Sequence, residues 1–116
     1  MKLRIQDNSL RLRLTQKEVA RLGDQGSVES AIRFSEDNVL RYRVLVSPDA
    51  HSVSVRYNGD TICVFLPAEI AGQWAKNADV TIEAFDSGVR LLVEKDFKCL
   101  HQAGAAEPDA YPHPLA

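Results

Sequence analysis

The side chains closest to the C-terminus are the first candidates for a chemical site. Cys99, His101 and His113 lie near the carboxylates of Glu107 and Asp109, and all of these are residue types that bind zinc. Their spacing lacks the paired Cys-x-x-Cys or His-x-x-x-His arrangement that marks a zinc site, and the segment is rich in Gly, Ala and Pro. We therefore expect no cofactor, and zinc bound by Cys99, His101 and His113 is the alternative.

Catalytic residues have less support than metal ligands. His51 with Ser52, and Cys99 with His101, are residue types that serve as base and nucleophile, but residues close in sequence seldom have the required geometry. The sequence contains no nucleophile elbow, phosphate-binding loop or His-Glu-x-x-His helix. It therefore favours a protein that is not an enzyme. The alternative is a small-molecule or metal-binding protein, an enzyme included, whose site is the C-terminal Cys/His segment.

A set of arginines forms the second candidate site. Each alternates with apolar residues along a predicted strand and so lies opposite the apolar face; the set is Arg4, Arg11, Arg13, Arg41 and Arg43. A basic sheet face of this kind can bind phosphates or a carboxylate-rich partner. The alternative is a solvated face whose arginines pair across strands with Glu29, Glu36 or Asp37. The net charge of −2 favours the solvated face, because nucleic-acid-binding domains are usually basic.

Charge is distributed unevenly along the chain. Lys and Arg outnumber Asp and Glu in residues 1–57, whereas acids outnumber bases in the remainder. A partner can therefore meet one half of the chain preferentially. The leading hypothesis is a non-enzymatic binding or regulatory module whose partner is nucleic acid or an acidic protein, and which is itself a monomer or a weak homodimer.

Length and composition limit the class of protein. A chain of 116 residues with 45% hydrophobic residues predicts a single domain over residues 1–116. The sequence contains no run of 18 apolar residues and no apolar signal-peptide region, so no membrane partner is expected. Two cysteines are too few for a disulfide framework. We expect a cytoplasmic protein of bacterial type.

The first half of the chain predicts four strands and a helix. The alternating segments that predict strands are residues 2–6, 10–14, 28–34 and 40–46. Thr15 and Glu18 have the spacing of a capping box, which predicts a helix over residues 16–22 that Gly23 ends.

The second half repeats this order. Its predicted strands are residues 51–57, 62–66, 80–84 and 89–93. Asn58-Gly59 predicts a tight hairpin turn, and Pro67 suits the first turn of a helix over residues 68–76. Each half therefore has the order strand, strand, helix, strand, strand, with pseudo-repeats over residues 2–47 and 51–96 and an extension over residues 97–116.

The two halves also match in their apolar positions. Residues 10–14 match residues 62–66 at an offset of 52. Val28 matches Val80 at the same offset. Residues 18–20 match residues 69–71 at an offset of 51, which requires that one residue is deleted in the second half. These matches predict an internal duplication. The alternative is two ordinary amphipathic hairpins that resemble each other by chance.

The second half is similar to the swapped-hairpin DNA-binding domains of the AbrB and MazE kind. The likeness is carried by Gly59, Val64, Leu66, Pro67, Glu69, Ile70, Asp79, Val80, Ile82, Gly88, Val93 and Lys95. In that family two chains interlock around one barrel-like core, so the resemblance implies that this chain carries both copies. Thr61 stands where the family has an exposed basic residue, and only the first half keeps arginines there, at Arg11 and Arg13.

The chain as a whole resembles a group of small bacterial proteins of unknown function, through its opening segments MKLRI, NSLRLRLT and EV and its later segments EKDFKCL and DAYPHP. That resemblance assigns no role to any residue. The predicted fold is α+β and mainly antiparallel β, with two ββαββ pseudo-repeats around one barrel-like core and two short helices. We expect four aromatic side chains to lie in the core or line a pocket, namely Phe34, Tyr42, Phe65 and Trp74.

Overall fold

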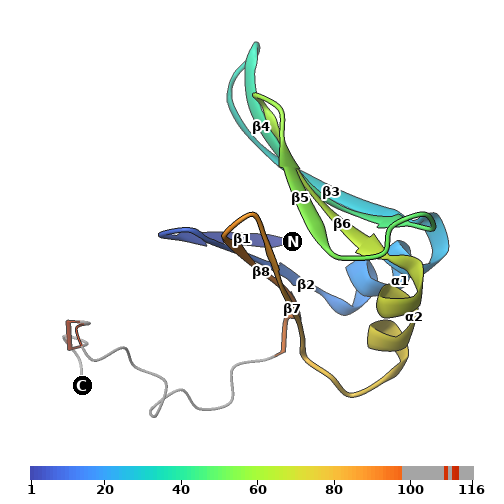
Figure 1. Cartoon of the computed structure of the whole chain (residues 1–116). Coiled ribbons are helices and arrows are strands. Elements are labelled where there is room, and N and C mark those ends of the chain that lie inside the picture. The colour runs from blue at the N-terminus through green and yellow to red at the C-terminus, as the bar shows by residue number, and fades with distance from the viewer. Residues whose placement is uncertain (98–108, 110, 113–116) are drawn as a thin grey trace.

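The computed structural model describes residues 1–97, 109, 111 and 112 (Figure 1). Elements of the first half are β1 (Lys2–Gln6), β2 (Ser9–Leu14), α1 (Gln16–Gln25), β3 (Ser27–Ser35) and β4 (Asn38–Ser47). Those of the second half are β5 (Ser54–Tyr57), β6 (Thr61–Pro67), α2 (Ala68–Lys76), β7 (Thr81–Asp86) and β8 (Val89–Lys95). The α+β class and the repeated order of strand, strand, helix, strand, strand are confirmed.

The strands form two mixed sheets of four strands each. Sheet A has the order β1-β2-β8-β7, and sheet B has the order β3-β4-β6-β5. Each sheet combines one antiparallel hairpin from each half, and the hairpins meet through a parallel pair, β2 with β8 in sheet A and β4 with β6 in sheet B. Neither half can therefore complete a sheet without the other.

The expected barrel-like closure is wrong. The first and last strands of each sheet are open edges, so the two sheets do not join into one closed barrel. In Figure 1 the sheets diverge away from the two helices, and the β3–β4 hairpin extends furthest from them. Strand alternation is satisfied by two opposed sheets as readily as by a barrel, so the sequence pattern could not separate the two arrangements.

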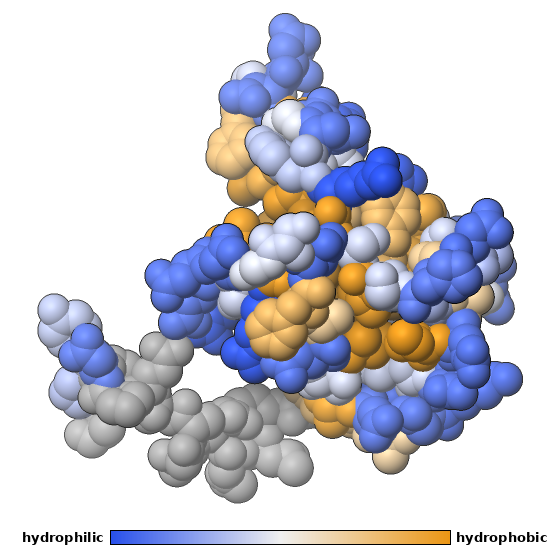
Figure 2. Space-filling model, in the orientation of Figure 1, coloured by the Kyte–Doolittle hydropathy of each residue, from blue (hydrophilic) through white to orange (hydrophobic). Residues whose placement is uncertain are grey.

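The core lies between the inner faces of the sheets and is closed by the helices. Leu12, Leu14, Val64, Leu66 and Val93 are almost fully buried, as the alternating pattern requires. Both sheets and both helices contribute to one cluster, which consists of Leu10, Leu12, Leu14, Leu22, Val28, Val44, Val53, Val64, Leu66, Ala71, Trp74, Leu91 and Val93. Figure 2 shows apolar residues at the angle between the sheets with polar residues around them.

Helix α1 begins with the predicted capping box. The Thr15 hydroxyl accepts a hydrogen bond from the backbone N–H of Glu18, and the Glu18 carboxylate accepts one from the backbone N–H of Thr15. The helix continues to Gln25, three residues beyond the predicted end, and Gly26 closes it. Gly26 has a φ of 80°, a left-handed conformation that glycine adopts without strain, whereas Gly23 stays helical.

Glu18 also binds the amino terminus of the chain. The Met1 ammonium lies 2.6 Å from a carboxylate oxygen of Glu18. Partial burial would by itself raise the pKa of Glu18. Hydrogen bonds from the ammonium and from Thr15, together with the charge of the ammonium, have the larger effect. They lower this pKa below its ordinary value of 4.5. Through this ion pair, the capping-box residue Glu18 joins the N-terminal end of β1 to the first turn of α1.

The two helices correspond without the expected deletion. Thr15 and Pro67 are the N-cap residues, and Leu22 and Trp74 are buried on the two helices, so both pairs keep the offset of 52. The offset of 51 that the sequence match required is therefore wrong. It rested on matching Glu18 with Glu69, but Glu69 lies one position earlier in its helix and is exposed.

Strand register also changes one of the predicted matches. Val28 pairs with Val44, whereas Ile82 pairs with Val93 in the equivalent hairpin, so Ile82 and not Val80 corresponds to Val28. Val80 precedes β7, and its backbone carbonyl accepts a hydrogen bond from the Trp74 indole N–H at 3.1 Å. The resemblance to the AbrB kind and the duplication behind it stay predictions. No helix of the described residues is long and apolar enough to cross a membrane.

Replacing Leu66 tests the shared core. Its side chain is fully buried between the sheets, so Leu66→Ala should lower the free energy of unfolding by about 2–5 kcal/mol. Val80→Ala is the control, since Val80 is 44% exposed and the change should stay within about 0.5 kcal/mol. Urea denaturation followed by circular dichroism measures both, and equal effects would contradict a core placed at Leu66.

The Glu18 contacts predict a dependence of stability on pH. A carboxylate whose folded pKa is lowered stabilises the fold above its unfolded pKa, and this contribution is lost as the pH falls through the folded pKa. Glu18→Gln should therefore cost about 1 kcal/mol at pH 7 and progressively less below about pH 4.5. Denaturation of both proteins at a series of pH values measures the difference, which should not grow on acidification.

Candidate functional site

The structure divides the five candidate arginines between two surfaces. Arg4 lies in β1 and Arg11 and Arg13 lie in β2, on the face of sheet A that points away from the core. Arg41 and Arg43 lie in β4, on the outward face of sheet B. The strand alternation that placed them opposite apolar positions is confirmed, but the set is two separate patches on two sheets.

Acidic residues from the second half partly neutralise the outer face of sheet A. Glu94 lies 3.4 Å from Arg11 and 3.1 Å from Arg13, because β8 pairs with β2 in parallel. Two further ion pairs join Arg90 with Glu83 at 2.6 Å and Lys2 with Asp96 at 3.0 Å. This face has the cross-strand ion pairs that the solvated-surface alternative expected, but the acids are Glu83, Glu94 and Asp96 and not Glu29, Glu36 or Asp37.

The outer face of sheet B keeps more of its positive charge. Its cations are Arg33, Arg41, Arg43 and Arg56, which lie in β3, β4 and β5. Glu29 is the carboxylate that pairs with this set, at 3.7 Å from Arg43, as the cross-strand alternative predicted. Within the described ranges, Arg33, Arg41 and Arg56 have no carboxylate partner. We call this surface the basic face.

A depression of about 250 Å³ lies in the basic face across β4, β5 and β6. Its apolar part consists of Leu45 and Phe65, and Arg56 places its guanidinium carbon 6.0 Å from the centroid of the Phe65 ring. The other lining residues are Arg43, Asn58, Thr61 and Cys63. The depression thus places cationic and apolar groups side by side on an exposed sheet.

Arg56 is absent from the candidate site predicted from the sequence. For Phe65 the sequence did not decide between a place in the core and a place in the wall of a pocket. The signal was present: Ile62, Val64 and Leu66 point inward, so the alternation directs Cys63 and Phe65 outward. Arg56 is the cross-strand partner of Cys63, which could not be known before the β5–β6 register. Phe34, also expected in the core or a pocket, is instead 64% exposed at the β3–β4 hairpin.

Arg43 has an unused hydrogen-bond donor within the depression. Its Nε atom is buried and has no hydrogen-bond partner among the described residues, although the guanidinium lies near Glu29. A buried donor without an acceptor costs about 1–3 kcal/mol. The Arg43 side chain as a whole is 40% exposed and lines the depression, so the outer part of its guanidinium group can contact a ligand there. The Nε atom of Arg11 is in the same state on sheet A, where it lies 3.4 Å from Glu94.

Cys63 lies in the floor of the depression as a neutral thiol. Burial raises its pKa, the positive charge of Arg43 lowers it, and the negative charge of Glu29 raises it again, so that the net direction is upward. A thiol with a raised pKa is a poor nucleophile at neutral pH. The depression therefore has the properties of a binding surface and lacks an activated catalytic group at Cys63.

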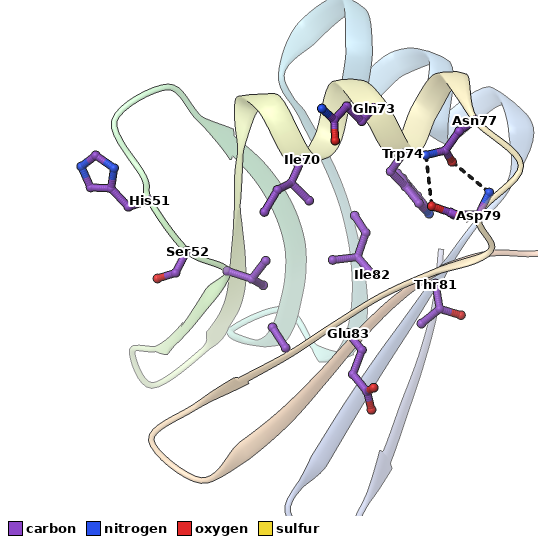
Figure 3. Close-up of a pocket in the computed structure, with 12 residues that line it drawn as sticks. His51, Ser52, Ile70, Gln73, Trp74, Asn77, Asp79, Thr81, Ile82 and Glu83 are labelled. Atoms are coloured by element: carbon purple, nitrogen blue, oxygen red, sulfur yellow. Dashed lines mark hydrogen bonds between the residues drawn. The ribbon is translucent and has the colours of Figure 1, made fainter.

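A second concavity lies between α2 and β7 (Figure 3). This groove of about 440 Å³ has Ile70 and Ile82 facing one another in its centre, while Glu83 points away from it. Some of its polar groups bond to one another: the Asn77 side chain donates to Asp79 at 3.1 Å, and the Trp74 indole N–H donates to the Val80 carbonyl in the α2–β7 connection. The groove has the size of a ligand site but few polar groups that converge in it.

Among the described residues, the remaining candidates are His51 and Ser52, and they do not form a metal or catalytic site. His51 and Ser52 lie at one end of the groove in Figure 3, and no hydrogen bond joins them. In residues 1–97, 109, 111 and 112, no group of three His, Cys, Asp or Glu side chains could hold a metal ion. Cys99, His101 and His113 lie outside the described residues, so zinc binding by these three stays a prediction.

The reactivity of Cys63 tests the electrostatics of the depression. In a Cys99→Ser background, the rate of alkylation by iodoacetamide should rise with pH through a midpoint above 9.0, the ordinary thiol value. Arg43→Leu should move this midpoint higher, and Glu29→Gln should move it lower, because the two charges act in opposite directions. A midpoint at or below 9.0 would contradict the buried, neutral thiol.

Comparison with known proteins places the chain in a family. No curated protein matches the sequence. One family model, described as a family of unknown function, matches residues 1–115. The predicted likeness to a family of unknown function is thereby confirmed, and the match names no AbrB-type domain. The chain belongs to the family of unknown function DUF7009.

Proposed function

We propose that this protein is a non-enzymatic binding module that recognises single-stranded nucleic acid through the basic face of sheet B. The observation that carries the proposal is the combination on one exposed sheet of arginines without carboxylate partners and an aromatic side chain. Within the described part of the chain, Arg41 and Arg56 supply guanidinium groups that no carboxylate pairs, and Phe65 supplies the aromatic ring.

The arginines suit phosphate recognition. A guanidinium group is planar, always charged and able to donate two parallel hydrogen bonds to a phosphate. Arg43 and Arg56 are both cross-strand neighbours of Cys63, on either side of it, so two strand spacings of about 4.8 Å separate their backbones. The Arg43 side chain lines the depression and is 40% exposed, so its guanidinium group can contact an anion there.

The apolar part of the depression suits bases. Single-stranded nucleic acids combine a charged backbone with bases that stack on aromatic side chains, each worth about 1–3 kcal/mol. Phe65 lies in β6, between the arginine-bearing strands β4 and β5, and Leu45 is its cross-strand neighbour in β4, so one ligand can contact guanidinium groups and the ring together. An acidic protein would use the arginines but would gain less from the ring, and nucleic acid is therefore the preferred partner.

The slightly acidic net charge does not oppose this proposal. Glu83, Glu94 and Asp96 lie in or beside sheet A, where they pair with cations of that sheet. Two acids lie near the depression: Glu29 pairs with Arg43, and Asp60, in the β5–β6 turn, accepts a hydrogen bond from Thr61. Local potential, rather than total charge, governs the approach of a charged ligand to a surface.

Neutralising arginines on each sheet in turn tests the proposal. Arg41→Gln/Arg56→Gln should weaken binding of a fluorescent oligothymidine at least tenfold and reduce the slope of log affinity against log salt by about 1.4, or about 0.7 for each lost contact. The matched control Arg11→Gln/Arg13→Gln removes the same charge from sheet A and should change affinity less than threefold. Fluorescence anisotropy measures both. Equal losses in the two variants, or no binding by the native chain, would overturn the proposal.

Phe65→Leu separates nucleic acid from an acidic protein as the partner. Leucine keeps the apolar character but removes the ring, so oligothymidine affinity should fall while the affinity for polyglutamate stays unchanged. Circular dichroism checks that the fold is retained. If Phe65→Leu leaves oligothymidine binding intact while Arg41→Gln/Arg56→Gln abolishes it, the ligand is recognised as a polyanion only.

A further inference from the structure

The open edge of β3 differs from the other edges of the two sheets. β3 has nine residues, compared with five in β1, four in β5 and six in β7. A long open edge is a template for pairing with another strand unless charge, shortness or a cover prevents it. Among the other edges, β1 carries Lys2 and Arg4, and the backbone N–H of Val55 in β5 donates to the Asp86 carboxylate at 2.9 Å.

The hydrogen bonds of the β3–β4 hairpin show which backbone groups face the open edge. Val46 donates to the Gly26 carbonyl at 2.8 Å, and the register then pairs Val28 with Val44. Bonded pairs alternate along an antiparallel ladder, so every second residue of β3 bonds to β4. The residues between them direct their N–H and C=O groups outward; these are Glu29, Ala31 and Arg33, and all three are exposed.

If β3 pairs in antiparallel fashion with β3 of a second copy, one register brings the outward N–H and C=O groups of the two strands into hydrogen-bonding positions. When Ala31 faces the second copy's Ala31, Glu29 faces Arg33 of that copy, and the outward N–H and C=O groups of all three residues meet acceptors and donors. Two hydrogen bonds for each such pair give about six in the interface. Opposite charges directly across a sheet stabilise it, whereas registers centred on Glu29 or on Arg33 bring like charges together.

The other face of β3 is also complementary to itself in this register. Ile32 is 48% exposed and Phe34 is 64% exposed, and Phe34 lies where the hairpin register shifts by a β-bulge. The register centred on Ala31 brings Ile32 to Ser30 of the second copy, and Phe34 follows at the bulge, beyond the regular pairs. The exposed Ile32 of one copy would thus continue the core face of the other. Figure 1 shows the β3–β4 hairpin extending away from the helices, so the edge can be reached.

We propose that two copies of this chain form a symmetric dimer by antiparallel pairing of β3, centred on Ala31. The two B sheets then become one eight-stranded sheet, and the two basic faces lie on the same side of it. The contact is isologous and closes at two copies. An interface of one strand from each copy buries little area, so the dimer is weak and forms at micromolar or higher concentrations. It does not rest on the proposed nucleic-acid binding, which uses Arg41 and Arg56.

Charge exchange across the dimer axis tests the register. Glu29→Arg places two arginines opposite each other at both ends of the interface, and Arg33→Glu places two glutamates there. Each variant should raise the dimer dissociation constant at least tenfold in sedimentation equilibrium. The double variant Glu29→Arg/Arg33→Glu restores opposite charges and should return to within about threefold of the native value.

A mixture of the two single variants gives the sharper test. In the heterodimer, the arginine introduced by Glu29→Arg faces the glutamate introduced by Arg33→Glu at one end of the interface. The native Arg33 of the first variant faces the native Glu29 of the second variant at the other end. The heterodimer therefore has two attractive pairs, whereas each homodimer has two repulsive pairs.

Labelling one variant and following its sedimentation should show heterodimers at concentrations where each variant alone is monomeric. This result cannot arise from misfolding of either variant. A native chain that is monomeric at a concentration on the order of 500 µM, well above the range expected for so small an interface, would overturn the proposal. A mixture without heterodimer would overturn it as well.

Discussion

The parallel pairing of β2 with β8 and of β4 with β6 is the contact on which the structure depends. These four strands are central in their sheets, and their inward residues are the most buried of the described chain, including Leu12, Val44, Val64 and Val93. Parallel neighbours cannot be joined by a tight turn, so each pair must bring together strands that are distant in sequence. The hairpins are local structures, but the core forms only when both halves are present.

This exchange of hairpins also determines the charge of the two outer faces. The arginines of β2 meet β8, whose outward residues include Glu94, and ion pairs follow. The arginines of β4 meet β6, whose outward residues are Thr61, Cys63 and Phe65, and no carboxylate of that strand is available to them. Similar basic strands of the first half therefore produce a partly neutralised face in sheet A and a more basic face in sheet B.

Local structure was predictable from the sequence because local interactions dictate it. Strand alternation, the Thr15 and Glu18 capping box, and the β5–β6 turn at Asn58-Gly59 each depend on residues within a few positions of one another. The end of α1 was missed because two glycines compete to end it, and the left-handed conformation occurs at the second, Gly26.

Sheet pairing was not predictable in the same way. Nothing within β2 specifies β8 as its neighbour, and one apolar stripe serves a barrel or two opposed sheets equally well. The arginine patch was predicted as one surface for this reason: alternation gives the face of a strand but not the sheet to which the strand belongs. The candidate site was correspondingly incomplete, because Arg56 joins Arg43 only through the register of β5, β6 and β4.

The two halves share an order of elements but differ in their second hairpins, and this difference controls what the edges can do. β3 and β7 occupy equivalent edges, yet β3–β4 has strands of nine and ten residues, whereas β7–β8 has strands of six and seven. Two equally long open edges would allow each copy to bind two others, and contacts of that kind can propagate into fibres. When two copies pair through one long, self-complementary edge, the backbone groups of that edge in both copies are hydrogen-bonded, and no open long edge remains to bind a third copy. The unequal hairpins thus favour a closed pair over an open chain of copies.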